Sequence, residues 1–406
     1  MKLTYKKNMI HVFDDDKFID VAIRLIEYVK PNESRYFVVK NNESPFQYVK
    51  SDKVEKISLK NEDELIRFAD FISSNCEVLF LHALNEYKQK LALLVSKKII
   101  KVWFVWGYDL YNKWPLLRRK IYEAETQNGL NVAEDTLKKK LTVNDFSFYL
   151  FKKLNIFQKI LPKRVIHGLK NKYETEFWKA IQSIDIVVPV IPNEVNYVKK
   201  INPNVLYAPF TYGSIEDLLG DKIGLNVLNG KNVLIGNSAD PSNNHLDIFS
   251  KLSKIHLGNR KVFVPLSYGG NEFYKSLVIK KGQELFGDNF VPLINFMALE
   301  KYNEILLSCG TLIFNHVRQQ GVGNIIIMGY LGAKIYLNPK SPVYGYYKDL
   351  GMHINSLKKL DSEKNLYPLT KKEVLNNKKI FFDLYSKESV LKKVQKMFEV
   401  IEKNKK

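Results

Sequence analysis

The sequence predicts an α/β protein of two domains, each built on a doubly wound parallel sheet. Short apolar runs alternate with helix-like stretches along most of the 406 residues. The runs are continuously apolar, as in strands that are buried on both faces of a parallel sheet. This strand–helix rhythm occurs twice, and a segment with four glycines separates the two series. We therefore expect two Rossmann-like domains that face a central cleft.

The first series of strands defines an N-terminal domain over residues 1–215. Helical stretches at 17–30 and 61–75 separate its first strands, as a doubly wound fold requires. The predicted strands cover residues 9–13, 35–39, 77–82, 101–106, 185–190 and 204–209.

The second series defines a C-terminal domain over residues 216–375, with helical stretches at 243–256, 271–285 and 298–308. Open α/β sheets bind ligands beyond the carboxyl ends of their strands, so the loops after these strands are the places to expect a site. The predicted strands cover residues 232–236, 261–266, 290–293, 311–315 and 333–337.

Three segments lie outside this rhythm. Residues 211–230 contain the four glycines and are predicted to form the hinge between the domains. Residues 376–406 are lysine-rich and periodic, and are predicted to form a C-terminal helix. In two-domain enzymes of this kind such a helix often crosses back to the first domain. The third segment is an insert at about 112–172.

This insert is strongly basic, with fourteen Lys and Arg against five Asp and Glu. An apolar stripe runs through it at helical spacing, and several lysines lie off that stripe. A basic helix with an aromatic face suits the surface of an anionic membrane. A helix that packs its stripe on the domain core explains the spacing equally well. The stripe consists of Phe146, Leu150, Leu154, Phe157 and Leu161.

The whole chain carries a formal net charge of +20. A positive balance favours nucleic acid, anionic lipid or phosphorylated small molecules as partners. Cys76 and Cys309 lie in apolar runs without metal or redox spacing, as expected of buried thiols in a reducing compartment. We see no signal peptide and no apolar run of about 18 residues, so we expect a cytoplasmic protein. A basic nucleic-acid-binding protein is the alternative of another class, but no RNA-binding signature occurs, so we expect no nucleic-acid partner.

The first candidate site is the loop GNSADPSNNH at 236–245, directly after a predicted strand. Gly236 permits close approach of the backbone, and Asn237 and Ser238 offer short hydrogen-bond donors. The next helix presents free N–H groups at its N-terminus, so the outline is that of a phosphate-binding loop. An ordinary connection between strand and helix is the alternative.

The second candidate loop is RQQGVGN, which follows the strand at 311–315. Arg318 is a fixed cation whose planar donor fork suits a diphosphate, although a surface salt bridge is its alternative role. Gln319 and Gln320 can recognise a sugar or a base. Between the two loops, Tyr268 precedes two glycines in a turn and is a candidate for stacking on a base. The glycines of the second loop and the start of the next helix are Gly321, Gly323 and Asn324.

In the N-terminal half, Asp109 follows a buried strand and a glycine. A carboxylate there suits a general base, or a residue that positions an acceptor hydroxyl. Capping of the next helix is its alternative. His82 ends another strand at the same edge, with a structural role as its alternative, and Asp14 to Asp16 read as a solvated acidic turn. No metal-binding triplet and no P-loop occurs, so we expect a metal-independent enzyme without a cofactor.

At these residues the sequence resembles a known family, the TDP-N-acetylfucosamine:lipid II N-acetylfucosaminyltransferases (4-alpha-L-fucosyltransferases, glycosyltransferase family 56). The resemblance is densest over about 232–340 and weaker over 9–111 and 177–215. The matching strings are WGYDLY at 106–111, VLIGNSADPSNNH at 233–245, VFVPLSYGGNEFY at 262–274 and RQQGVGN at 318–324.

The resemblance implies a GT-B fold, a TDP-linked deoxy-amino sugar as the donor and a polyprenyl-diphosphate-linked saccharide as the acceptor. It also implies work on the cytoplasmic face of the inner membrane during surface-polysaccharide assembly. Much of the basic insert has no counterpart in the family, so the acceptor is less defined than the donor. A glycosyltransferase of the same fold with another donor or acceptor is the alternative.

Each matching string carries candidate residues over by position. We expect Arg318 to stabilise the leaving diphosphate, and Asp109 or His82 to act on the acceptor hydroxyl. The residues carried over are Asn237, Ser238, Asn243 and His245 in the first loop, Arg318, Gln319, Gln320, Gly321 and Gly323 in the second, and Asp109 in the N-terminal string.

Overall fold

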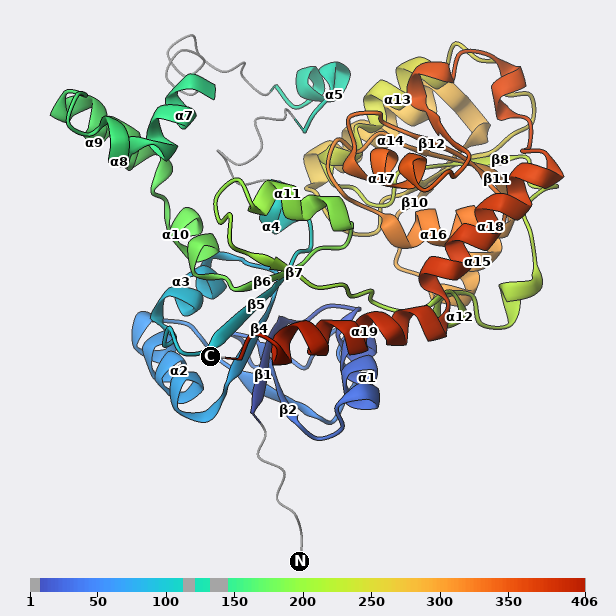
Figure 1. The fold of residues 1–406 in the computed structure, drawn as a ribbon. Coiled ribbons are helices and arrows are strands. Elements are labelled where there is room, and N and C mark those ends of the chain that lie inside the picture. The colour runs from blue at the N-terminus through green and yellow to red at the C-terminus, as the bar shows by residue number, and fades with distance from the viewer. Residues whose placement is uncertain (1–7, 112–120, 132–144, 406) are drawn as a thin grey trace, which may run out of the picture. The chain divides into compact units, whose positions relative to one another are not determined.

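The structure is a computed structural model that divides into two compact units (Figure 1). Each unit is an α/β domain with a parallel sheet, which confirms the predicted fold class. The described residues are 8–111, 121–131 and 145–405. Unit 1 comprises residues 1–118, 133–212 and 391–406, and unit 2 comprises residues 119–132 and 213–390.

The sheet of unit 1 has the strand order β3-β2-β1-β4-β5-β6-β7, and every pair in it is parallel. The strands β1, β4 and β5 are buried almost completely on both faces, because most of their residues are apolar and do not alternate with polar ones. The strands are β1 (Met9–Asp14), β2 (Ser34–Val39), β3 (Val54–Ile57), β4 (Val78–His82), β5 (Ile100–Phe104), β6 (Ile186–Val188) and β7 (Leu206–Tyr207).

Helices connect these strands and cover the sheet of unit 1 (Figure 1). The C-terminal helix α19 (Lys387–Glu402) also packs here, where Phe398 meets Phe80 of β4 with ring centroids 6.3 Å apart. The other helices are α1 (Ile19–Val29), α2 (Glu62–Asn75), α3 (Glu86–Leu94), α4 (Tyr108–Tyr111), α7 (Asp145–Lys152), α8 (Leu154–Phe157), α9 (Lys163–Tyr173), α10 (Glu176–Ser183) and α11 (Val195–Val198), with a short η1 (Pro192–Glu194).

The sheet of unit 2 has the order β10-β9-β8-β11-β12-β13 and is parallel throughout. Its strands are β8 (Asn232–Ile235), β9 (Val262–Pro265), β10 (Phe290–Leu293), β11 (Cys309–Phe314), β12 (Lys334–Leu337) and β13 (Ile354–Ser356). Its helices are α5 (Ala124–Gly129), α12 (Ile215–Leu219), α13 (His245–Leu252), α14 (Glu272–Phe286), α15 (Leu299–Ser308), α16 (Val322–Tyr330), α17 (Pro342–Asp349) and α18 (Lys371–Tyr385). Single-turn helices are η2 (Gly220–Gly224), η3 (Pro241–Asn243), η4 (Gly287–Asn289), η5 (Leu357–Lys359) and η6 (Glu363–Leu366).

The expected hinge contains regular structure. The Ser214 hydroxyl accepts from the backbone N–H of Asp217, and the Asp217 carboxylate accepts from the backbone N–H of Ser214. This capping box starts α12, so part of 211–230 is a helix and not a plain linker. The chain passes from unit 1 to unit 2 between residues 212 and 213, which is one of several such passages.

The basic insert forms separate helices where one continuous stripe was expected. The chain leaves the helix at Lys153, so the stripe changes face there. Leu154 is buried, and Leu150 and Leu161 pack against the core of unit 1, whereas Phe146 is 69% exposed. The stripe therefore serves the core in part. Residues 112–120 and 132–144 of the insert lie outside the described residues.

Candidate active site

In each unit the strand order reverses beside a central strand, between β1 and β4 in unit 1 and between β8 and β11 in unit 2. Connections leave the two strands of such a pair in opposite directions, which opens a crevice at their carboxyl ends. In unit 2 the loop after β8 (236–244) and the loop after β11 (315–321) flank this point. The two loops that the sequence singles out are therefore neighbours.

Asn243 holds both loops together from inside. Its fully buried amide accepts from the backbone N–H of Asn237 (2.9 Å) and from Nε2 of His316 (2.7 Å). It donates to Oγ of Ser238 (3.2 Å) and to the carbonyl of Asp240 (2.8 Å). Burial holds the pKa of His316 well below its usual range, so the neutral ring donates one N–H to Asn243. One amide thus fixes the geometry of two loops.

Gly236 and His245 close the base of the first loop. Gly236 has φ +66°, and a Cβ there would lie 2.7 Å from Nε2 of His245. His245 is fully buried, and burial lowers its pKa to about 3. Its Nδ1 lies 3.3 Å from the Tyr274 hydroxyl. Among the predicted binding residues, His245 and Asn243 therefore shape the loop from beneath its surface.

Arg318 is held in a fixed direction by the first loop. Its Nε donates to Oγ of Ser242 (2.9 Å), and a terminal nitrogen lies 3.5 Å from Oδ2 of Asp240. The arginine side chain is 7% exposed and that of Asp240 is 33% exposed, so this ion pair lies just below the surface. A phosphate that binds here competes with Asp240 for the guanidinium.

Tyr268, Asn237 and Gln320 join three loops in one network. Gln320 donates to Oδ1 of Asn237 (3.1 Å), and Asn237 donates to the Tyr268 hydroxyl (3.0 Å). Tyr268 remains 41% exposed, so its ring is open to a ligand. The backbone N–H of Ala239 donates to the Tyr268 carbonyl (2.8 Å), which ties the loop after β9 to the loop after β8.

The remaining predicted residues of the second loop have different surroundings. Gln319 is buried, and its Oε1 has no hydrogen-bond partner within the described part of the chain. Gly321 has φ +65° and immediately precedes α16. Gly323 is exposed on the first turn of that helix. Asn324 donates to the Tyr302 hydroxyl (2.9 Å), away from the network of Asn237.

Sequence reasoning missed three members of this site, namely Asp240, Ser242 and His316. All three lie inside or beside the quoted strings, so their positions in the chain were a usable signal. Their roles depend on contacts across the two loops, which spacing along one loop does not reveal.

In unit 1, Asp109 is fully buried and organises the strand ends around it. Its carboxylate accepts from the backbone N–H of Leu84 (2.8 Å), from Trp103 Nε1 (2.7 Å) and from the backbone N–H of Trp106 (2.9 Å). Burial raises the pKa of Asp109, and these three donors oppose the rise. A base must expose an oxygen to its acceptor, so this arrangement supports the structural alternative.

His82 is equally enclosed. Its Nε2 lies 3.2 Å from Nδ1 of His11, and its Nδ1 lies 2.8 Å from the Tyr212 hydroxyl. The ring stacks between Phe13 and Phe104 at centroid distances of 3.9 and 4.2 Å. Burial lowers the pKa of His82 well below its ordinary value. The ring is therefore neutral and engaged at both nitrogens.

Asp14 to Asp16, at the end of β1, differ from the solvated turn that the sequence suggested, because all three are partly buried and hydrogen-bonded. The carboxylates of Asp14 and Asp15 each accept several hydrogen bonds within unit 1. The carboxylate of Asp16 accepts only from the backbone N–H of Phe18 (3.1 Å) among the described residues. Burial raises the pKa of Asp16. The partners of Asp14 are Asn85, Tyr87 and Lys88, and those of Asp15 are Lys40, Gln47, Tyr48 and Val49.

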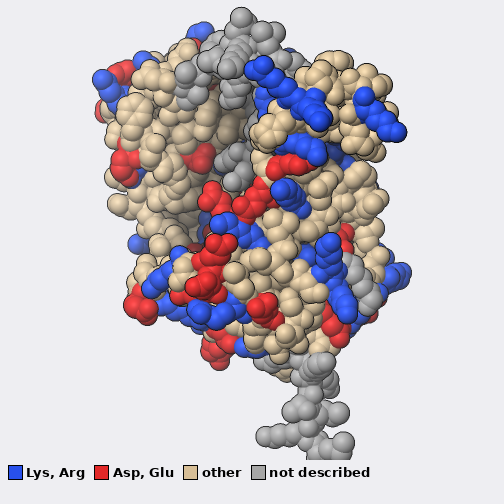
Figure 2. All heavy atoms as spheres, turned by 90° about the vertical axis from the view of Figure 1, so that its left-hand side faces the viewer, with Lys and Arg blue, Asp and Glu red and all other residues tan. Residues whose placement is uncertain are grey.

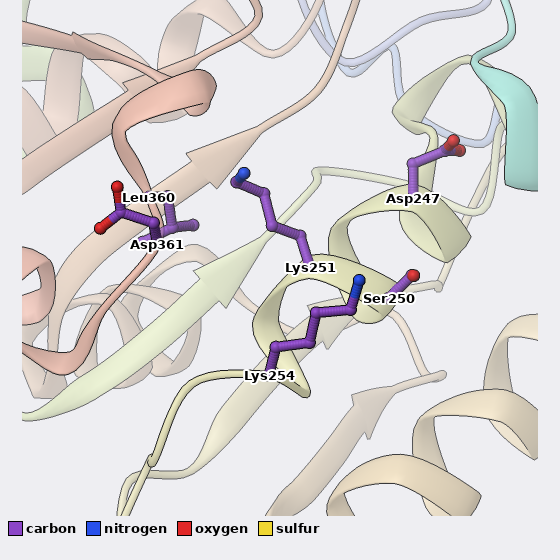
Figure 3. A pocket seen from close by; sticks show the side chains of 6 residues that line it. All are labelled: Asp247, Ser250, Lys251, Lys254, Leu360 and Asp361. Atoms are coloured by element: carbon purple, nitrogen blue, oxygen red, sulfur yellow. The ribbon is translucent and has the colours of Figure 1, made fainter.

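A pocket of about 320 Å³ lies elsewhere on unit 2 (Figure 3). Its lining shares no residue with the three loops, so it is separate from their network. The residues that line it are Asp247, Ser250, Lys251, Lys254, Leu360 and Asp361. Across the residues that the structure describes, no three His, Cys, Asp or Glu side chains gather as a metal site would require. None of the described helices is long and apolar enough to cross a membrane.

Residues 195–380 match the model of the family described as 4-alpha-L-fucosyltransferase, glycosyl transferase group 56. This region is similar to glycosyltransferase group 56. The match includes both loops and most of unit 2, so it confirms the resemblance seen in the sequence. The chain is a glycosyltransferase, and its group 56 region carries the network around Arg318.

Solved structures that match this chain over nearly its whole length show that its fold is GT-B. Sucrose-phosphate synthase from Thermosynechococcus elongatus has a TM-score of 0.57 at 9% identity, over 98% of this chain and 99% of that one. The N-terminal domain of trehalose-6-phosphate phosphatase from Candida albicans has the same score and identity, over 100% and 98%. A UDP-forming α,α-trehalose-phosphate synthase from Burkholderia vietnamiensis has a TM-score of 0.57 at 10% identity, over 97% and 99%. At such identities the likeness concerns the fold alone.

Proposed function

We propose that this glycosyltransferase moves a deoxy-amino sugar of the N-acetylfucosamine type from TDP to a polyprenyl-diphosphate-linked saccharide. The reaction belongs to bacterial surface-polysaccharide assembly and needs no metal ion. The observation that supports the donor class most is the position of Arg318. It is a directed cation between two loops at the switch point of the sheet, within the group 56 region.

In this proposal unit 2 binds the donor. Arg318 turns from Asp240 to the diphosphate and stabilises the negative charge that grows as the sugar–phosphate bond breaks. The exposed ring of Tyr268 packs on the base or the sugar, and Gln320 reads a polar group beside it. The buried amide of Asn243 keeps these donors in place before the donor binds.

Unit 1 binds the acceptor at its own switch point, between the ends of β1 and β4. Of the carboxylates at the end of β1, Asp16 is the one whose hydrogen bonds leave it available, so we assign to it the deprotonation of the acceptor hydroxyl. Asp109 and His82 then support the strand ends, and neither contacts the reacting atoms.

A thermal-shift screen of the purified protein with TDP, UDP and GDP tests the donor class. We expect TDP to raise the Tm most, because binding to the folded state stabilises it. UDP belongs in the screen because one solved protein of the same fold is UDP-forming. A shift with UDP or GDP alone would contradict the TDP assignment and keep the nucleotide-sugar class. No shift with any of the three would contradict both.

We further propose that the enzyme works on the cytoplasmic face of the inner membrane and docks there through α7, α8 and α9. Residues 146–173 contain seven Lys and Arg and no Asp or Glu. Figure 2 views the side on which these helices lie in Figure 1; several Lys and Arg lie at its upper right, and others lie lower down among Asp and Glu. Large apolar side chains are exposed within residues 146–173, namely Phe146, Tyr149, Ile156, Ile160 and Val165. Apolar groups beside cations suit an anionic lipid surface.

Sedimentation with lipid vesicles tests this docking surface. We expect binding to vesicles of phosphatidylcholine and phosphatidylglycerol but not to phosphatidylcholine alone. Replacing Ile156 and Ile160 by Ser, or three lysines by Gln (K152Q, K153Q and K159Q), should abolish it. The matched control removes three exposed lysines of unit 2 instead (K358Q, K359Q and K364Q). Full binding by the helix variants would exclude this surface as the anchor.

A further inference from the structure

The segment of residues 121–131 belongs to unit 2, although it interrupts the chain of unit 1. The described residues on either side, up to 111 and from 145, belong to unit 1, whereas 121–131 belong to unit 2. We call this segment the strap. Its helix α5 lies beside α13 (Figure 1). The fit is close, because a Cβ on Gly129 would lie 2.7 Å from Cδ1 of Leu246. The strap is thus an integral part of unit 2.

Asn244 fastens the start of the strap to the first loop of the candidate site. Its Nδ2 donates to the carbonyl of Ile121 (3.0 Å), and its Oδ1 accepts from the backbone N–H of Glu123 (2.8 Å). Asn244 is fully buried, has φ +53° and directly follows Asn243, the amide that joins the two loops. The residue between these two contacts is Tyr122, whose backbone is therefore fixed against the site.

The rest of the strap is fastened equally well. The Glu123 carboxylate accepts from Nδ2 of Asn338 (2.9 Å) and from Nζ of Lys340 (2.9 Å). The carboxylate of Asp247 on α13 accepts from two backbone N–H groups at the start of α5. These contacts hold the strap on both sides of Tyr122.

The surroundings of the Tyr122 side chain are those of the candidate site. Tyr122 is half-buried, and its hydroxyl makes no hydrogen bond to any described residue. Burial raises its pKa, the carboxylate of Asp240 adds to the rise, and Arg318 opposes it. Both residues that flank Tyr122 are hydrogen-bonded to Asn244, so this side chain leaves the backbone next to the loop that carries Ser242 and Asp240, the partners of Arg318. The phenol is a neutral hydrogen-bond donor.

We propose that Tyr122 is a donor-binding residue that the strap supplies to unit 2, and that its hydroxyl donates a hydrogen bond to the diphosphate held by Arg318. This inference rests on the proposed function, because it requires a nucleoside diphosphate at the loops. A neutral donor suits this place, since Asp240 repels a phosphate and Arg318 is the cation that offsets that repulsion. The basic insert therefore contributes to the donor side of the enzyme.

Calorimetric titration of the full-length protein with TDP, and with thymidine as the ligand without phosphates, tests this proposal. For Tyr122→Phe we expect TDP to bind about 10-fold more weakly and thymidine to bind as to the wild type, because only a hydrogen bond to a charged phosphate is lost. Tyr367→Phe is the control, since this exposed tyrosine lies at the amino end of β12, where its carbonyl accepts from Lys334. It should leave both affinities unchanged. Equal Tm values of the three proteins confirm that the fold is intact.

The possible outcomes distinguish the role of Tyr122 from the assignment of the donor class. Equal TDP affinity of Tyr122→Phe and the wild type would overturn the role of Tyr122 alone. A loss of thymidine affinity in the same variant would assign the residue to the base and overturn its contact with the diphosphate. Failure of the wild type to bind TDP would overturn the donor class and this inference with it.

Discussion

Buried amides determine how single residues of the site act. Asn243 and Asn244 are fully enclosed, and their side chains make hydrogen bonds to both loops and to the strap. A buried polar group without such partners would cost about 1–3 kcal/mol, so these contacts fix the conformation of the loops. Ser242 and Asp240 belong to the first of these loops, and their contacts hold Arg318 in a single orientation. The cation is therefore in place before a ligand arrives.

Replacing Arg318 by Ala should raise the KM for the donor and lower kcat. In the proposed function, the guanidinium binds the diphosphate in the ground state and stabilises it more strongly in the transition state. Hydrogen bonds to charged groups contribute about 1.5–3 kcal/mol, so we expect kcat/KM to fall roughly 10- to 100-fold. Steady-state kinetics measure both constants, and Arg318→Lys serves as the control that keeps the charge but loses the fork. Unchanged kinetics in a folded Arg318→Ala protein would remove Arg318 from the mechanism.

Two aspartates of unit 1 should respond in opposite ways to the same change. Asp16→Asn removes a base, so we expect kcat to fall by about 100-fold or more with little change in Tm. Asp109→Asn turns an amide N–H toward three buried donors, so we expect a loss of about 1–3 kcal/mol in the free energy of unfolding. Urea titration and turnover assays on both variants separate the roles. Normal turnover by Asp16→Asn would show that another group is the base.

At the scale of elements, the site depends on how the loop after β9 packs against the loop after β8. Gly270 has φ +66°, and a Cβ there would lie 2.1 Å from the carbonyl oxygen of Ala239. Since that oxygen belongs to the backbone, it has no side-chain freedom to move aside. The close approach places Tyr268 next to Asn237. The glycine is thus part of the binding geometry.

Gly270→Ala should therefore weaken donor binding as well as the fold. A residue with a side chain at positive φ costs about 1–3 kcal/mol, and the clash with Ala239 adds to that cost. Gly351→Ala is the matched control, because Gly351 has φ +79° but no atom within 4 Å of its added Cβ. We expect both variants to lower the Tm and only Gly270→Ala to reduce TDP affinity in calorimetry. Equal TDP affinities would show that the two loops move independently.

At the scale of the whole molecule, the buried strands and the two loops after β8 and β11 could be predicted from the sequence, because continuous apolar runs are a local signal. The edge strand β3 could not, since its residues Val54–Ile57 are partly or fully exposed and carry charges. The position of the strap could not be predicted either, for another reason. Its place in unit 2 depends on Asn244 and Asp247, more than 100 residues away along the chain. The burial of Asp109 could not be predicted for the same reason, because burial arises from packing between distant segments.

Stability should fall in mild acid, because each unit encloses two histidines that burial keeps neutral. The pKa of His11 and of His245 is lowered from 6.5 to about 3, and those of His82 and His316 are also lowered. The unfolded chain takes up these protons near pH 6.5, whereas the folded chain does not. The neutral histidines therefore make their full contribution to the free energy of unfolding above pH 6.5. As the pH falls toward 3, this contribution decreases by about 1.4 kcal/mol per pH unit for each histidine.

Urea unfolding at pH 7 and at pH 5 measures this loss, and the variant His11→Phe identifies its source. The ring of His11 stacks on Phe80 with centroids 4.0 Å apart, so a phenyl ring retains most of the packing, although it removes the contact between Nδ1 of His11 and Nε2 of His82. We expect the free energy of unfolding of the variant to depend on pH less than that of the wild type, by about the contribution of one histidine. His256→Gln, which changes an exposed histidine of unit 2, should leave the dependence unaltered. An unchanged dependence in His11→Phe would mean that the buried ring takes up its proton within the folded protein.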